Sequence, residues 1–392
     1  MTDYRAETVG SLLRSEAVIS DARRGSLADQ DLLNEATIDA VRLQEEAGLD
    51  VITDGEVRRT AWAQTPRFLD CFTPVPGRGV LNWRGGMSQT GALGGGNEAG
   101  APGGDSGGPG AGAAARPGGG YPAVTSRVRD ATRLGDMAAD YEFLAGYLRL
   151  RGGEPRRAKF TMPAPSYHRR YWSPGHSAAV YRSAEEYLKE IRDYLREVVD
   201  RLIALGCDYI QLDAPNYGSL CDPDTRARMD ADGRDLQAEL AFDTELDNSL
   251  FDGIEGITTA LHICRGNGPG GAWHSAGGYA AISGALFPKL DFGRLLLEYD
   301  SGRAGGFEPL KDVCPGTVVV LGLLTTKSDS LDDEASVEAR ITEATLLKPL
   351  HELALSTQCG FASVPSANPV TPVGQRAKLE MVGRLARRIW SS

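Results

Sequence analysis

Two potential metal ligands, His262 and Cys264, stand two residues apart at the end of an apolar run. Residues 257–261 have the composition of a buried β-strand, in which side chains two apart point to the same face. We therefore expect the imidazole and the thiol to point the same way, as ligands of the kind that zinc prefers. The spacing alone is also consistent with chance, with Cys264 packed as a small apolar side chain.

Other reactive or polar residues follow strand-like apolar runs in the same way. We predict eight such strands, at residues 7–11, 49–56, 158–166, 207–215, 257–264, 294–300, 317–324 and 353–360. At or just after their carboxyl ends stand Ser11, Asp54, Glu56, Ser166, Asp213, His262, Cys264, Glu298, Asp300, Lys327 and Cys359. Any one of these could be a structural polar group or a helix cap, but all eight ends carry one.

Helical patterns separate these runs, for example at residues 31–47, 187–205 and 372–390. The strand-like runs are continuously apolar rather than alternating, which is typical of parallel strands that are buried on both faces. The pattern predicts an α/β fold, a (β/α)8 TIM barrel, and a doubly wound open sheet is the alternative. In a TIM barrel the carboxyl ends of the strands share one rim, so the reactive residues should converge there.

A low-complexity stretch, residues 85–125, interrupts the pattern after the second predicted strand. Within residues 91–120, 14 of 30 are glycine, so this stretch buries too little apolar surface to offset its ordering entropy. We predict a disordered insertion within a single domain, residues 1–392, and a lid over the site is the alternative. A phosphate-binding loop is excluded because no Gly-x-x-x-x-Gly-Lys-Ser/Thr motif occurs.

The composition favours small-molecule or protein partners. The net charge of -11 argues against a nucleic-acid surface and offers no basic patch for an anionic membrane. The amino terminus has no apolar signal core, and no run of 18 apolar residues occurs. Six scattered cysteines are not a secreted disulfide framework. We expect a cytoplasmic protein with reduced thiols; the oligomeric state is left open.

Five motifs in this order resemble the catalytic carboxyl-terminal barrel of cobalamin-independent methionine synthase. They lie at residues 9–14, 53–56, 211–213, 262–267 and 358–361, and the resemblance runs from Thr8 to about Pro372. It implies a single-barrel paralogue, related also to the epoxyalkane:coenzyme M transferases. By this resemblance His262, Cys264, Glu298 and Cys359 would be zinc ligands.

Two thiolates, one neutral imidazole and one carboxylate around a dication leave a net charge near -1. A substrate thiol displacing the oxygen ligand would bind as a thiolate, because the metal lowers the thiol pKa below its free value of ~8.5. The resemblance therefore implies thiol activation rather than hydrolysis by metal-bound water.

The resemblance also implies a site for homocysteine and for a methyl donor. The residues expected to bind substrate are Gly10, Ser11, Glu56, Asp213, Arg265 and Asp300, with Asp213 and Lys327 as catalytic residues. Trp62, Trp172, Trp273 and His274 could line the donor pocket. The chain departs from the family's pattern at three points, which leave the identity of the methyl donor open. Ala214 stands where the family has a carboxylate, and Lys327 stands where it has a proton-shuttling histidine. The long enzymes of the family also carry a second, amino-terminal barrel, for which this chain has no room. A lysine donates a proton only if its pKa is depressed.

The function predicted is zinc-dependent alkyl or methyl transfer to a small thiol such as homocysteine. The alternative is addition of a zinc-bound thiol to an epoxide or another non-folate electrophile, with Lys327 protonating the alkoxide. A zinc-stabilised scaffold that binds a partner is a third hypothesis. A uroporphyrinogen decarboxylase-like enzyme would share the barrel but needs no metal, and the His262 and Cys264 pair with Cys359 counts against it.

Overall fold

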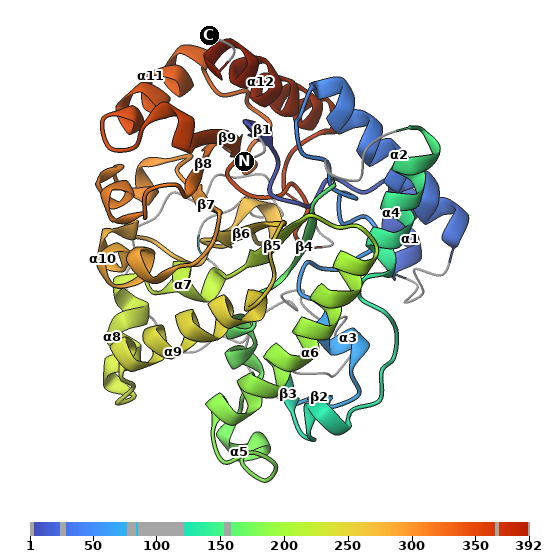
Figure 1. Ribbon diagram of the computed structural model, residues 1–392, viewed down its shortest axis with the longest axis vertical. Coiled ribbons are helices and arrows are strands. Elements are labelled where there is room, and N and C mark those ends of the chain that lie inside the picture. The colour runs from blue at the N-terminus through green and yellow to red at the C-terminus, as the bar shows by residue number, and fades with distance from the viewer. Residues whose placement is uncertain are drawn as a thin grey trace.

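A curled sheet of seven parallel strands forms the centre of the computed structural model (Figure 1). The structure describes residues 4–23, 29–76, 84, 121–152, 158–364 and 368–390. Around the sheet the strands follow the order β1, β9, β8, β7, β6, β5, β4, without the reversal that marks a doubly wound sheet. Their bounds are β1 Ala6–Glu7, β4 Phe160–Pro163, β5 Tyr209–Asp213, β6 Thr258–Ile263, β7 Arg294–Glu298, β8 Val318–Leu324 and β9 Leu353–Thr357. The predicted α/β class with a parallel, barrel-like sheet is confirmed.

The long helices of the described residues, such as α2, α6 and α12, lie around the outside of this sheet, and short helices such as α5 lie farther from it (Figure 1). They are α1 Glu16–Arg23, α2 Gln30–Ala47, α3 Thr65–Phe68, α4 Ala139–Leu150, α5 Pro174–Ser177, α6 Ala184–Ala204, α7 Pro215–Ser219, α8 Pro223–Ala231, α9 Leu236–Asn248, α10 Ser283–Leu286, α11 Glu334–Thr345 and α12 Pro372–Trp390. Within the described part of the chain, none is long and apolar enough to cross a membrane.

Local sequence signals set the ends of the long helices. Asp29 caps α2 by accepting a hydrogen bond from the backbone N–H of Leu32, and Gly48 ends the helix with a positive φ of 77°. Ser183 caps α6 in the same way. These ends fix where each helix returns the chain to the next strand.

The sheet is buried on both faces, as its continuous apolar runs predict. All seven residues of β8 are buried. Alternate residues of the strands and of the loops beside them point inward and form a small inner core, composed of Val9, Val51, Tyr209, Ala260, Leu296, Val318, Val320 and Ala354. The apolar residues that alternate with these along the strands, such as Ile210, Leu295 and Val319, belong to the larger core shared with the helices. A side-chain layer drawn from successive strands is the interior of a barrel rather than of an open sheet.

The predicted second strand, residues 49–56, forms a single parallel bridge, between Ile52 and Ala158. It still links the two edges of the sheet: Asp50 N–H donates to Ala6 O at 2.8 Å, and Lys159 N–H donates to Ile52 O at 2.8 Å. A longer strand does not form because the Asp50 carboxylate takes the N–H of Ala6, and a left-handed turn begins at Gly55. The prediction of eight full strands is therefore wrong at this position.

The end of the predicted insertion, residues 85–125, belongs to the folded structure. Residues 85–120 lie outside the described residues, but Pro122–Val124 form β3, which pairs with β2, Phe72–Pro74, in an antiparallel sheet. Tyr121 stacks on Tyr171 with ring centroids 5.4 Å apart. The apolar residues that close the glycine-rich stretch are buried, which explains the difference.

Candidate metal centre and adjoining cavity

Four side chains converge at the carboxyl rim of the sheet. His262 lies in β6, Cys264 follows it, Glu298 ends β7, and Cys359 follows β9. One ligand atom from each lies within 4.8 Å of the others, and the two sulfur atoms are 3.7 Å apart. Parallel strands bring their carboxyl ends together, so these residues meet although almost 100 positions separate Cys264 from Cys359. The structure thus brings together all four predicted metal ligands.

The hydrogen bonds of the cluster leave the ligand atoms available. His262 Nδ1 donates to Leu296 O at 3.2 Å, so Nε2 is the atom left for a metal, which binds the neutral imidazole, and this buried atom has no hydrogen-bond partner among the described residues. Glu298 Oε1 accepts the N–H of Arg265 at 2.8 Å, and the buried Oε2 has no such partner in the same part of the chain. Glu298 Oε2 also has an ion-pair contact with Arg303 Nη2 at 3.9 Å. Buried ligand atoms without hydrogen-bond partners beside two thiols suit a metal ion with nitrogen, sulfur and oxygen ligands.

The titratable groups of the cluster strongly change one another's pKa. The hydrogen bond from Cys264 and the neighbouring His262 outweigh burial and hold the pKa of Cys359 well below its usual value. Burial lowers the pKa of His262, but the Cys359 thiolate, Asp213 and Glu298 together raise it to about 9. The metal-free cluster therefore holds a thiolate beside protonated groups, and binding of a cation would release those protons.

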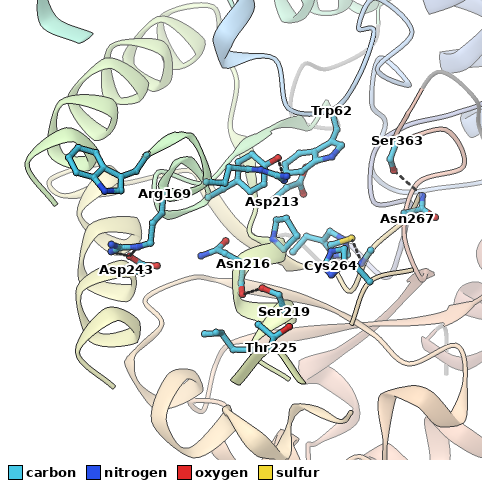
Figure 2. A pocket seen from close by; sticks show the side chains of 18 of the residues that line it. Trp62, Arg169, Asp213, Asn216, Ser219, Thr225, Asp243, Cys264, Asn267 and Ser363 are labelled. Atoms are coloured by element: carbon cyan, nitrogen blue, oxygen red, sulfur yellow. Dashed lines mark hydrogen bonds and ion pairs between the residues drawn. The ribbon is translucent and has the colours of Figure 1, made fainter. Parts of the chain in front are cut away.

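A cavity of about 740 Å³ opens from this cluster. Figure 2 shows Cys264 and Asp213 near one end and Arg169 with Asp243 at the other. Four large aromatic side chains, Trp62, Tyr121, Tyr167 and Trp172, are part of its wall. A small amino acid fills only part of such a volume, so the cavity has room for a second reactant beside the cluster.

Three of the predicted substrate-binding residues, Ser11, Glu56 and Asp213, line the inner end of the cavity. Burial raises the pKa of Glu56 and raises that of Asp213 to about 7. Gly10 lies behind Glu56, where a β-carbon would come within 2.4 Å of Glu56 Oε1. Gly10 therefore supports the site by leaving space for this carboxylate.

Three other predicted residues, Arg265, Asp300 and Lys327, are not among the described residues that line the cavity. The fully buried Arg265 guanidinium donates to the carbonyls of Gly277 and Arg303. Lys327 Nζ donates to Gly266 O at 2.9 Å and to Asn267 Oδ1 at 3.1 Å. Arg265 and Lys327 hold the loop that follows β6, and Asp300 is half-buried after β7.

Asn267 ties together the two loops that carry the cysteines. Its Nδ2 donates to Gly360 O at 2.7 Å and to Ser363 Oγ at 2.9 Å, a contact visible in Figure 2. Sequence reasoning gave this residue no role. Its position, three residues after Cys264 and before a glycine, was the available signal.

The aromatic wall was predicted only in part. Trp62, Trp172 and His274 line the cavity as expected, whereas Trp273 instead exchanges two backbone hydrogen bonds with Arg84. The residues missed include Tyr167 and Arg170, from the short helix Ser166–Tyr171 after β4. The cluster of basic and aromatic residues directly after a predicted strand could have indicated them.

Solved structures share this fold over almost the whole chain. A putative vitamin-B12 independent methionine synthase from Listeria monocytogenes is 25% identical, with a TM-score of 0.68 and coverage of 99% of this chain and 98% of that one. A B12-independent methionine synthase from Shewanella sp. W3-18-1, solved in complex with selenomethionine, is 18% identical, covers 99% and 98% of the two chains, and has the same fold with a TM-score of 0.64. The chain thus shares its fold with proteins described as B12-independent methionine synthases.

Two curated proteins place the chain more closely, although no protein-family model matches it. The uncharacterized proteins YxjH and YxjG of Bacillus subtilis (strain 168) are each 30% identical, and each alignment covers 99% of this chain and 95% of the relative. The chain belongs to the family of YxjH and YxjG.

Proposed function

We propose that this protein is a zinc-dependent methyltransferase that alkylates a small thiol such as homocysteine. The observation that carries the proposal is the cluster of His262, Cys264, Glu298 and Cys359 at the inner end of a cavity with room for two reactants. The likeness to the Listeria protein supports it. Six free cysteines are consistent with the reducing, cytoplasmic location that we also propose.

The four residues would hold zinc through His262 Nε2, Glu298 Oε2 and the two cysteine sulfur atoms. Zinc bound there supplies thiol activation, because it lowers the pKa of a substrate thiol so that the thiolate is present at neutral pH. The three negative charges on Cys264, Cys359 and Glu298 exceed the charge of the dication. Electron density therefore stays on the substrate sulfur, which favours nucleophilic attack.

The chain's own residues would bind and orient the acceptor. Glu56 and Asp213 face the inner cavity and suit the ammonium group of an amino acid, and Ser11 can donate to its carboxylate. Trp62 and Tyr167, with ring centroids 4.6 Å apart, help to exclude water from the wider part, where the donor would lie. In the transfer, a sulfur–carbon bond forms as the donor–methyl bond breaks, and the leaving group keeps that electron pair.

The test is metal analysis combined with a screen of thiols and methyl donors, read by product mass. The donors would include 5-methyltetrahydrofolate and a methylated corrinoid. We expect methyl transfer that depends on the thiol and that is lost together with zinc in Cys359→Ser. The buried Cys71→Ser variant is the matched control, since Cys71 lies outside the cluster. Full activity in a metal-free preparation would overturn the proposal.

A second candidate function is addition of the thiol to an epoxide, as in the epoxyalkane:coenzyme M transferases. Lys327 favours it: its side chain does not line the cavity, but its Nζ contacts Gly266 and Asn267, which both do. Here the sulfur–carbon bond forms as a carbon–oxygen bond of the ring breaks, and Lys327 would supply the proton to the alkoxide. The product mass separates the candidates: an adduct is the sum of both reactants, whereas a methylated thiol gains one methyl group.

A further inference from the structure

The barrel interior beneath the cavity contains buried charges that the proposed mechanism does not use. Lys159 is 1% exposed and precedes β4. Its Nζ donates to Glu7 Oε2 at 2.7 Å, to Thr8 O at 2.7 Å and to Gln211 Oε1 at 2.8 Å. An ammonium group has three donors and no acceptor, so these bonds use all its hydrogen atoms. Arg294 also pairs with Glu7, at 2.7 Å.

Lys159 determines which way the Gln211 side chain faces. Because the Gln211 carbonyl oxygen accepts from Lys159, the amide nitrogen points the other way and donates to Asp213 Oδ1 at 2.7 Å. A reversed amide would place N–H groups against an ammonium and an oxygen against a carboxylate. One oxygen of Asp213 is therefore fixed as an acceptor from the protein, while the residue lines the cavity.

A second set of residues repeats this arrangement at Glu56. The buried Arg59 donates from Nη1 to Thr161 Oγ1 at 3.0 Å, so the Thr161 hydroxyl proton is free to donate to Glu56 Oε1 at 2.8 Å. Glu56 Oε2 is buried and, among the described residues, has no hydrogen-bond partner. Thr161 lies two residues after Lys159, so both side chains face the barrel interior.

In both sets a buried cation orients a neutral residue, here called a relay, which donates to one oxygen of a cavity carboxylate. We propose that these relays, Gln211 set by Lys159 and Thr161 set by Arg59, turn one oxygen each of Asp213 and Glu56 toward the substrate. Two acceptor oxygens at the inner end of the cavity then select thiols that also carry an ammonium group. The relays are positioning residues, and the inference rests on the proposed thiol site.

Calorimetric binding of two thiols to the zinc-loaded protein tests this inference. Homocysteine carries an ammonium group, and 4-mercaptobutanoate has the same thiol and carboxylate without it. We expect the wild-type protein to prefer homocysteine, and Thr161→Val and Gln211→Met each to lower that preference at least ~10-fold, the effect of losing a hydrogen bond to a charged group. The affinity for 4-mercaptobutanoate should stay unchanged.

Two further variants separate positioning from a general loss of structure. Thr161→Ser keeps the hydroxyl and should restore the preference. Tyr209→Phe removes a hydroxyl that donates to Glu7 at 2.9 Å, at the far end of the same buried network, and should leave the preference intact. Thermal unfolding checks that each variant folds, and the two relays provide independent variants if one does not.

The outcomes distinguish this inference from the proposed function. If the wild-type protein binds neither thiol, the proposed function and the relay inference both fail. If it binds both but folded Thr161→Val and Gln211→Met keep the wild-type preference, the relay inference alone fails. Equal weakening of both thiols would also overturn it, because that result reports damage to the whole cavity.

Discussion

Replacement of Glu298 by glutamine should weaken zinc binding while the fold is kept. Glutamine has the same shape, and its oxygen can still accept the N–H of Arg265, now 2.8 Å from Glu298 Oε1. Its NH2 group then occupies the Oε2 position that faces His262 and the two cysteines, and it offers no lone pair to a metal. If the amide reverses, the buried N–H of Arg265 loses its acceptor at a cost of about 1–3 kcal/mol. Because about 1.4 kcal/mol is tenfold in affinity, we expect at least a ~10-fold rise in the zinc dissociation constant.

Competition for zinc against a chromogenic chelator at neutral pH measures this constant. Glu308→Gln is the matched control, since it removes the same charge from an exposed position outside the cluster. Circular dichroism and thermal unfolding of the metal-free proteins confirm that both variants fold. Zinc affinity equal to that of the wild-type protein in folded Glu298→Gln would refute the role of Glu298 as a ligand.

Three other outcomes follow from the same geometry. Burial raises the pKa of Asp213 from 3.8 to about 7, so the folded state retains a proton that the unfolded chain releases, and the carboxyl group costs up to about 4 kcal/mol above pH 7. Asp213→Asn should therefore raise the melting temperature of the metal-free protein at about pH 8 but not at about pH 4, and equal shifts would contradict this assignment. Gly10→Ala would place a β-carbon 2.4 Å from Glu56 Oε1, so calorimetry should show ~10-fold weaker homocysteine binding with unchanged zinc content; unchanged affinity would show that Glu56 does not bind the ammonium group of homocysteine. Lys327→Met removes the bonds to Gly266 and Asn267 and should lower the free energy of unfolding, measured with denaturant, by about 1–3 kcal/mol. Loss of turnover at unchanged stability would instead place Lys327 in the chemistry.

The metal cluster could be predicted because a strand imposes a simple rule on its side chains. Side chains two residues apart on a strand point to the same face, so His262 and Cys264 lie together. The common rim of parallel strands brings many polar side chains to the same edge, and the resemblance to the methionine synthase barrel is what singled out Glu298 and Cys359 among them. Neither rule needs knowledge of packing. The parallel sheet could be predicted because strands that are buried on both faces have continuous apolar runs.

The side chains on the loops could not be predicted in this way. Its position just after a strand places Lys327 near the rim. The direction of its side chain depends on the loop oxygen atoms to which it donates, and these belong to residues about 60 positions earlier in the chain. Arg265 turns away from the cavity for the same reason, since its acceptors lie on two later loops. The orientation of the Gln211 side chain could not be predicted either, because it depends on a hydrogen bond from Lys159, which directly precedes β4.

The single bridge at Ile52 makes the barrel wall uneven in local stability. Elsewhere each strand shares a ladder with its neighbours, whereas here three separate backbone bonds are described: Asp50 N–H to Ala6 O, Leu12 N–H to Gly55 O and Lys159 N–H to Ile52 O. Amide hydrogen exchange should therefore be fastest along this seam. Glu56 directly follows this weakly paired segment, and Asp213 ends β5. A ligand that binds both carboxylates would therefore stabilise this part of the barrel wall. Occupancy of the cavity and closure of the barrel would then be thermodynamically linked, with ligand binding slowing exchange at the seam first.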